Sequence, residues 1–299
     1  MNRHLFLTLV LIAMGLAWGA SQSLGKIAVS TGHGFFGLIF WQLVVGAVVL
    51  GPFCVFSGPL RPGKRAMLFA VGIALIGTII PNSAFYISVA RLPAGIMSIL
   101  IATVPLMAFP MALALGMDRI SGLRLAGLGC GIAGVALIAL PAASLPSPAM
   151  VAYLPLALVG PLFYAIESNV VARYGTAGMN AVQAMFLVSV TGAVMVLPLV
   201  LASGQWIDPL QPFGRAEWAL IAGSVAHAVA YASYVWLASQ AGAVFASQCS
   251  YIVTGTGVIW AMVLLGERFS PWVWAALLVM LAGLALVKPR ASNLPLPSA

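Results

Sequence analysis

Apolar stretches of bilayer-spanning length dominate this chain of 299 residues. A helix needs about 20 residues to cross the hydrocarbon core, and stretches of that length are separated here by short connections rich in glycine, proline and charge. We predict ten membrane helices, at residues 5–25, 35–56, 66–88, 94–116, 122–141, 151–172, 180–202, 217–238, 243–265 and 271–288. Alternating segments of about 10 residues, as membrane β-barrels require, are absent from the sequence. The predicted fold class is therefore an all-α polytopic membrane protein.

The composition agrees with this class and argues against other ones. Hydrophobic residues make up 63% of the chain and charged residues 6%, far from the globular range. The net charge of +8 comes from cations scattered at the ends of apolar runs, which is typical of membrane topology rather than of nucleic-acid binding. The cysteines, Cys54, Cys130 and Cys249, lie singly in apolar runs without metal-ligand spacing. We predict no cofactor, no metal and no nucleic-acid partner.

One half of the sequence repeats the other. Residues 266–270 (Gly-Glu-Arg-Phe-Ser) correspond to residues 117–121 (Met-Asp-Arg-Ile-Ser) at an offset of 149 positions. The same offset lays residues 282–287 over residues 133–138 without a gap. The predicted organisation is a first five-helix repeat at 1–141, a linker at 142–150, a second five-helix repeat at 151–288, and a disordered tail at 289–299.

The repeat and the charges together predict a topology. Five crossings are an odd number, so the second copy begins on the opposite side of the membrane and the repeats are inverted. With a cytoplasmic N-terminus, nine cations fall on the inner side and four on the outer side. This bias favours cytoplasmic placement of both termini, although it is carried mainly by the first half of the chain.

The chain resembles the drug/metabolite transporter superfamily in its ten-helix EamA branch, and looks most like the YddG-type aromatic amino-acid exporters. The resemblance covers essentially the whole chain and rests on Ala17-Trp18-Gly19, the Gly-Glu turn at 266–267, Gly283 and the duplication. It implies a carrier of the bacterial inner membrane with a central cavity between the halves. The first repeat departs from the pattern, with Met117 and Asp118 where the second has Gly266 and Glu267.

Glu167 is the acidic residue that lies well inside an apolar run. An intramembrane carboxylate is costly enough to be a functional hypothesis by default, and this one could hold an ammonium group or relay a proton. Alternatively it lies near the lipid headgroups or pairs with Arg173, which is roughly 9 Å away at a rise of about 1.5 Å per residue. Aligning helices 5–25 and 151–172 places Gln22 opposite Glu167 and Trp18 opposite Phe163.

A polar and aromatic stripe runs along the predicted helix at 217–238. His227, Tyr231 and Tyr234 occupy i, i+4 and i+7, which is one helical face. The repeat offset maps this face onto Thr78, Asn82 and Phe85. Such groups would lack partners if they faced lipid, so both faces are expected to look inward, lining a cavity or making interhelical hydrogen bonds. His227 is also a candidate proton site.

The predicted cavity draws on both halves. The lining residues expected from these patterns are Trp18, Gln22, Thr78, Asn82, Tyr86, Met97, Ser98, Tyr164, Glu167, His227, Tyr231, Tyr234, Gln248 and Tyr251. Aromatic rings suit flat apolar substrates or cations, while Glu167 and the amide, imidazole and hydroxyl groups suit a zwitterion.

These features predict a secondary transporter rather than an enzyme. Its substrates would be small amphipathic molecules, aromatic or hydrophobic amino acids above all, exported by alternating access, with the lipid bilayer as its other partner and a monomer as the simplest assembly. A multidrug or quaternary-cation exporter of the same superfamily is an alternative. A membrane-embedded lipid-modifying enzyme is the alternative of another class; it would require clustered carboxylates or histidines, whereas Glu167 and His227 are far apart in the sequence. A channel would require ion-selective rings of charge, which are missing from the sequence.

Overall fold

The computed structural model describes residues 3–60, 62–241 and 248–287, and these residues form helices without any strand. The first half contains α1 (Arg3–Ala28), α2 (Phe35–Phe56), α3 (Lys64–Ile73), η1 (Ala74–Ile79), α4 (Ile80–Val89), α5 (Ala94–Ile101), α6 (Thr103–Ala114) and α7 (Gly122–Ala139). The second half contains η2 (Pro148–Tyr153), α8 (Leu154–Tyr174), α9 (Ala181–Ala202), α10 (Arg215–Ala241), α12 (Cys249–Leu265) and α13 (Pro271–Leu286).

The lengths of these helices fit a multi-pass membrane protein. Seven helical segments within the described residues are long and apolar enough to cross a membrane, namely Leu5–Ala28, Phe35–Phe56, Lys64–Val89, Ala94–Ala114, Gly122–Ala139, Pro148–Tyr174 and Ala181–Ala202. Two further apolar helices, α12 and α13, are shorter. The predicted tail at 289–299 lies outside the described residues, as do residues 243–247 of the predicted helix at 243–265.

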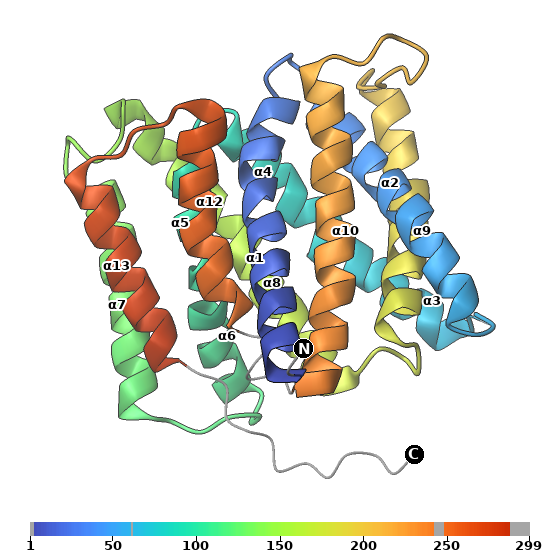
Figure 1. Cartoon of the computed structure of the whole chain (residues 1–299), viewed down its shortest axis with the longest axis horizontal. Coiled ribbons are helices and arrows are strands. Elements are labelled where there is room, and N and C mark those ends of the chain that lie inside the picture. Colours follow the sequence, from blue (N-terminus) through green and yellow to red (C-terminus); the bar gives the residue numbers. More distant parts are fainter. Residues whose placement is uncertain (1–2, 61, 242–247, 288–299) are drawn as a thin grey trace.

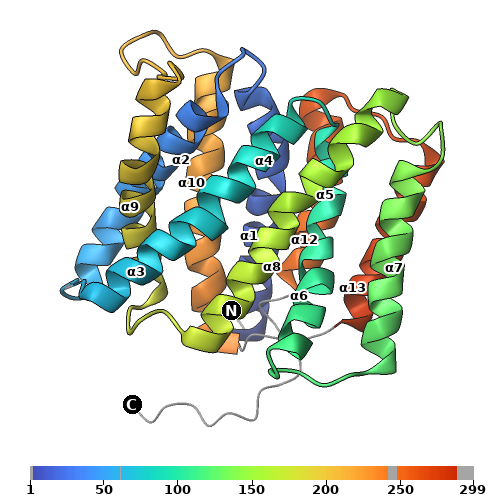
Figure 2. The ribbon, with the colours of Figure 1, turned by 180° about the vertical axis from the view of Figure 1, so that it is seen from behind.

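The two halves of the chain interleave rather than forming separate bodies. In Figures 1 and 2, α1 and α8 stand in the middle, with α2, α3, α9 and α10 on one side and α5, α7, α12 and α13 on the other. We call the end of the bundle where α1 begins the N-terminal face, and the other end the far face. From its start at Arg3, α1 runs toward the far face, whereas α8 runs from the far face back (Figure 2).

Helix contacts respect the sequence repeat. α1 packs along α10 and α12, while α8 packs along α4, α5 and α6. α2 pairs with α9, and α7 pairs with α13. In the sequence repeat, α1 corresponds to α8, so the contacts that α1 makes with the second half correspond to those that α8 makes with the first half. The pairs α2–α9 and α7–α13 each join a helix to its own counterpart in the other half. Close approach in one of these pairs depends on glycine, because a Cβ atom on Gly127 would lie 2.5 Å from Val287 and one on Gly134 2.4 Å from Met280.

Pro81 and Pro105 interrupt the regular α-helical hydrogen bonding of two helical segments in the first half. Pro81 has no N–H to offer the Gly77 carbonyl, and the six residues of η1 around Gly77 form a π-helix in which Ile80 N–H bonds to the Leu75 carbonyl. Pro105 likewise offers no N–H to Ile101, the residue at which α5 ends before α6 begins at Thr103. Single π-helical turns are frequent at functional sites.

The polar turn at 266–270 and Lys26 together cap two helix ends in the first half. Both carboxylate oxygens of Glu267 accept hydrogen bonds at the start of α5, from Ala94 N–H at 2.8 Å and Gly95 N–H at 3.0 Å. Lys26 caps the preceding helix end by donating to the carbonyls of Val89 and Leu92. A negative charge at a helix N-terminus and a positive one at a C-terminus are both favourable, so this pair of caps fixes the connection between α4 and α5.

Candidate functional site

Trp18 of α1 is surrounded by the stripe predicted on α10. Its ring packs edge-on against His227, Tyr231 and Tyr234, with centroid separations of 5.7, 6.5 and 6.2 Å. Trp18 Nε1–H also donates to His227 Nδ1 at 3.2 Å. The structure therefore brings together four of the predicted lining residues, from the two helices that pack most closely in the centre of the bundle.

The hydrogen bond from Trp18 determines the tautomer of His227. Because Nδ1 accepts the indole proton, it carries none of its own, and the remaining proton of the neutral imidazole sits on Nε2. Nε2 is then a donor. Protonating the ring would place a proton on Nδ1 and break this bond, so the charge on His227 is coupled to the position of Trp18.

A second cluster lies around the amide of Gln42, on α2. Gln42 Oε1 accepts from Asn82 Nδ2 at 3.3 Å and from the Tyr86 hydroxyl at 2.9 Å. Asn82 Oδ1 in turn accepts from the Tyr164 hydroxyl at 3.1 Å. Both acceptor positions of Gln42 Oε1 are thereby occupied, and the network leaves its Nε2 group to act as a donor elsewhere. These contacts join α2 and α4 to α8 of the other half.

The two clusters meet at a small cavity. It has a volume of ≈ 30 Å³, close to the share of one water molecule in the liquid. Its polar lining consists of Gln42, Thr78, Ser189, Ser224, His227 and Tyr231. Gln42 comes from the amide network, His227 and Tyr231 come from the Trp18 cluster, and Thr78 lies in the π-helix η1. The centre of the bundle is thus polar and nearly closed.

Glu167 lies beside the π-helix. A Cβ atom built on Gly77 would come within 2.7 Å of the Glu167 carboxylate, so a larger residue at this position would require the carboxylate to shift. Tyr164 and Tyr231 are both within electrostatic reach of Glu167. Within the described structure Glu167 makes no ion pair with Arg173. The partly buried carboxylate therefore adjoins the residues of both clusters.

The other predicted lining residues have different surroundings. Met97 and Ser98 are buried in α5, where Ser98 Oγ donates to the Ala94 carbonyl and a Cβ on Gly257 would meet it at 2.4 Å. They contribute to the packing of α5 against α12. The Gln22 side-chain oxygen and the Tyr251 hydroxyl are buried without a hydrogen-bond partner among the described residues. Gln248 lies just before α12.

Three polar residues of the cavity were not among those predicted from the sequence: Gln42, Ser189 and Ser224. Gln42 could have been predicted from the sequence, since it is the one amide, hydroxyl or charged residue in the apolar run at 35–56. The two serines could not have been predicted, because serine hydroxyls that donate to a carbonyl of their own helix are common in membrane helices. Ser224 does so here, donating to the Leu220 carbonyl at 2.7 Å.

The site is made of hydrogen-bonding, acidic and aromatic groups. No group of three or more His, Cys, Asp or Glu side chains gathers to hold a metal within the part of the chain that the structure describes. The polar centre instead offers hydrogen-bond donors at Gln42 and His227, a carboxylate at Glu167 and several aromatic faces.

Comparison with known proteins identifies the family. The model of the EamA-like transporter family matches residues 5–140 and again residues 152–288. The chain belongs to the EamA-like transporter family. This family is part of the drug/metabolite transporter superfamily, and its members are membrane transporters, not enzymes. The two matched segments also show that the family unit occurs twice in the chain.

The fold of this EamA-family chain occurs in solved structures as well. One crystal structure superposes with a TM-score of 0.65, covering 94% of this chain and 95% of that chain at 16% sequence identity. At that identity the likeness concerns the fold alone. No curated protein sequence matches the chain significantly.

Proposed function

We propose that this EamA-family transporter exports aromatic and hydrophobic amino acids. The observation that carries the proposal is the meeting of unlike groups around one cavity. Gln42, His227 and Tyr231 line it, Trp18 packs against His227 and Tyr231, and the Glu167 carboxylate lies near Tyr231. A zwitterion with an apolar side chain requires each of these, namely donors for its carboxylate, an acceptor for its ammonium group and an apolar face.

The transport mechanism we propose is alternating access of two inverted five-helix repeats. Support comes from the exchange symmetry of the helix contacts and from the opposite directions of α1 and α8 in Figure 2. Inverted repeats commonly place substrate at their interface near the bilayer midplane. In this proposal the ten predicted helices all cross a bacterial inner membrane, with both termini in the cytoplasm.

The size of the cavity bears on the mechanism. Sites for small molecules usually enclose about 300–1,000 Å³, whereas the central cavity measures ≈ 30 Å³. Substrate binding would therefore require the helices around Gln42 and His227 to separate. We infer that the structure represents a closed conformation of the carrier, between states open to either side.

The proposal is tested by counterflow in proteoliposomes. Purified protein is reconstituted with unlabelled phenylalanine inside, and accumulation of labelled amino acids from outside is followed with and without a pH gradient. We expect phenylalanine, tryptophan and leucine to exchange and glutamate not to. Folded protein that moves none of the amino acids would overturn the proposal.

A second candidate is export of quaternary ammonium compounds. The cluster of Trp18, Tyr231 and Tyr234 beside Glu167 favours it, because aromatic faces and a carboxylate together attract a cation. Adding tetraphenylphosphonium and choline to the counterflow panel distinguishes the two. Competition by these cations, with no exchange of amino acids, would favour the second candidate.

A further inference from the structure

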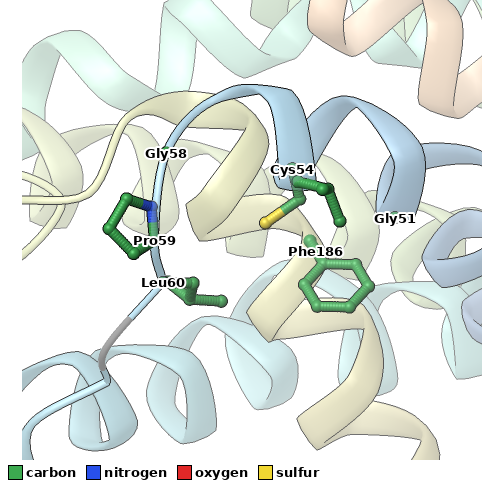
Figure 3. A pocket seen from close by; sticks show the side chains of 7 residues that line it. Gly51, Cys54, Gly58, Pro59, Leu60 and Phe186 are labelled. Carbon is green, nitrogen blue, oxygen red and sulfur yellow. The ribbon is translucent and has the colours of Figure 1, made fainter.

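A second hollow lies away from the central site, where α2 ends beside α9. It has a volume of ≈ 520 Å³ and is lined by Gly51, Cys54, Val55, Gly58, Pro59, Leu60 and Phe186. In Figure 3, Pro59 and Leu60 border one side, and Cys54 and Phe186 border the other. We call this hollow the α2–α9 groove. All its side chains are apolar apart from the weakly polar thiol of Cys54.

The fold fixes the shape of this groove. Gln183, in the first turn of α9, donates from Nε2 to the carbonyls of Ser57 and Gly58, both at 3.4 Å. Gly58 has φ +97, which lets the chain turn sharply after α2. Leu60 then packs against a buried cluster that includes Ala66 and Leu187. The segment from Ser57 to Leu60 is thereby anchored to α3 and α9.

The groove opens toward apolar surroundings on one side. At the end of α2, Val55 is 78% exposed and Phe56 89% exposed. In a membrane protein such side chains face lipid, because in water they would lose the hydrophobic free energy of burial. A molecule in the α2–α9 groove would therefore be in contact with the bilayer.

Cations gather next to the groove. Lys64 and Arg65 begin α3, four and five positions after Leu60, and both are exposed. Arg173 lies in the last turn of α8, and the preceding Val170 and Val171 pack against the same cluster as Leu60. Within the described structure, none of these three cations forms an ion pair with an acid. The N-terminal face of the bundle is therefore positive here.

We propose that the α2–α9 groove binds one anionic phospholipid. An acyl chain would lie between Leu60 and Phe186, and the phosphate-bearing headgroup would be held by Lys64 and Arg65 at the start of α3. The combination of an apolar groove open to lipid with adjacent unpaired cations favours this ligand over a neutral lipid. The same combination favours a phospholipid over a soluble anion, because a soluble anion has no acyl chain to bury in the groove.

The test uses the full-length protein in detergent and counts bound lipid by native mass spectrometry. Phosphatidylglycerol is titrated against phosphatidylcholine with the same acyl chains. The wild type should hold one phosphatidylglycerol more tightly than any phosphatidylcholine. Arg65→Ala should weaken phosphatidylglycerol binding about fivefold, since a cation near the lipid surface contributes on that scale, whereas Arg119→Ala, which removes an exposed cation from the α6–α7 turn, should not.

Filling the groove should remove the site for both lipids. A Cβ on Gly51 would meet Phe186 at an ordinary contact distance of 3.5 Å, so Gly51→Leu can direct a side chain into the groove without a backbone clash. The matched control is Gly129→Leu on the exposed surface of α7, where a Cβ meets nothing within 4 Å. Equal binding of the two lipids, or equal effects of the two leucine variants, would overturn the proposal.

A second measurement leaves the groove unaltered. With Cys130→Ser and Cys249→Ser, the groove residue Cys54 is the remaining thiol. Phosphatidylglycerol should slow its alkylation by N-ethylmaleimide more than the same concentration of phosphatidylcholine does. Identical alkylation rates in the two lipids would contradict the assignment even if Gly51→Leu proved poorly folded.

Discussion

At the scale of single residues, the centre of this transporter depends on hydrogen bonds that orient groups toward a shared cavity. Gln42 Oε1 is engaged by Asn82 and Tyr86, and His227 Nδ1 is engaged by Trp18. Each bond leaves a donor on the other side of the same side chain. An N–H donor of this kind can donate to a carboxylate oxygen of a substrate.

The first prediction concerns Gln42. Gln42→Leu removes a donor, and a lost hydrogen bond to a charged group is worth about 1.5–3 kcal/mol. The KM for phenylalanine counterflow should therefore rise at least about tenfold. Phenethylamine, which lacks the carboxylate, should be affected much less.

The control for this variant is Gln211→Leu, in the exposed loop before α10, where the amide bonds only Asp208 among the contacts described. An equal rise in KM for phenylalanine and phenethylamine would argue that Gln42 holds the helices together rather than the carboxylate.

The second prediction concerns Glu167. If this carboxylate carries a proton during export, Glu167→Gln abolishes accumulation driven by a pH gradient but preserves counterflow, because counterflow needs no net proton movement. Both activities are measured in the same proteoliposomes. Loss of both would instead assign Glu167 to binding of the substrate ammonium group.

At the scale of helices, the π-helix η1 couples a backbone feature to the site. It follows from Pro81, places Thr78 at the cavity, and brings Gly77 against Glu167. The continuous helical segment Lys64–Val89 is thus divided by a turn whose hydrogen bonds differ from those on either side. Such a turn is a natural place for the helix to change shape.

The third prediction follows from this contact. Gly77→Ala introduces a Cβ at 2.7 Å from the Glu167 carboxylate, which must then move. Transport should fall about tenfold or more, as is common when a binding group is displaced by about 1 Å, while expression and monodispersity are retained.

Gly72→Ala is the matched control for Gly77→Ala. Gly72 belongs to the same helical segment, and a Cβ there meets nothing within 4 Å. Equal initial transport rates for the two variants would show that the contact between Gly77 and Glu167 has no role in transport.

At the scale of the whole molecule, several contacts join the two halves at the far face. His33, between α1 and α2, lies 2.5 Å from Glu217 at the start of α10, measured from Nε2 to Oε1. Gln205 Oε1 accepts from the Phe36 N–H at 2.9 Å, and Trp41 donates to the Ile207 carbonyl at 3.0 Å. In the proposed alternating-access mechanism, these contacts break when the cavity opens toward this face.

The fourth prediction is that weakening this closure exposes the cavity. A partly exposed contact between a carboxylate and a basic side chain contributes about 0–1 kcal/mol, so Glu217→Gln should shift the population open to the far face by up to about fivefold. The readout is alkylation of Ser224→Cys, a cavity position, by an impermeant maleimide in a background without the three native cysteines.

Asp208→Asn provides the comparison for Glu217→Gln. Its carboxylate bonds the Leu210 N–H and Gln211 within its own loop and does not bridge the halves. Alkylation that is accelerated equally by Asp208→Asn and Glu217→Gln would contradict a specific role for the pair formed by His33 and Glu217.

Local sequence patterns determined the class of the protein. Apolar runs of bilayer length predicted a polytopic helical membrane protein, and the structure confirms this class. The duplication and the Gly-Glu turn predicted the EamA family, which the two matches confirm. The ten crossings, their inversion and the amino-acid substrate remain predictions. The stripe of His227, Tyr231 and Tyr234 was readable because a helical face repeats every few residues.

Only the tertiary structure decided which faces meet. Helical periodicity indicates which residues share a face of one helix, but it does not identify the neighbouring helix that packs against that face. Contacts between Trp18 and His227, or between Gln42 and Asn82, join residues of different helices, and packing of the whole bundle selects them. Packing also assigned Ser98 to the contact between α5 and α12. Packing also placed Glu267 of the 266–270 turn at the start of α5, where it acts as a cap.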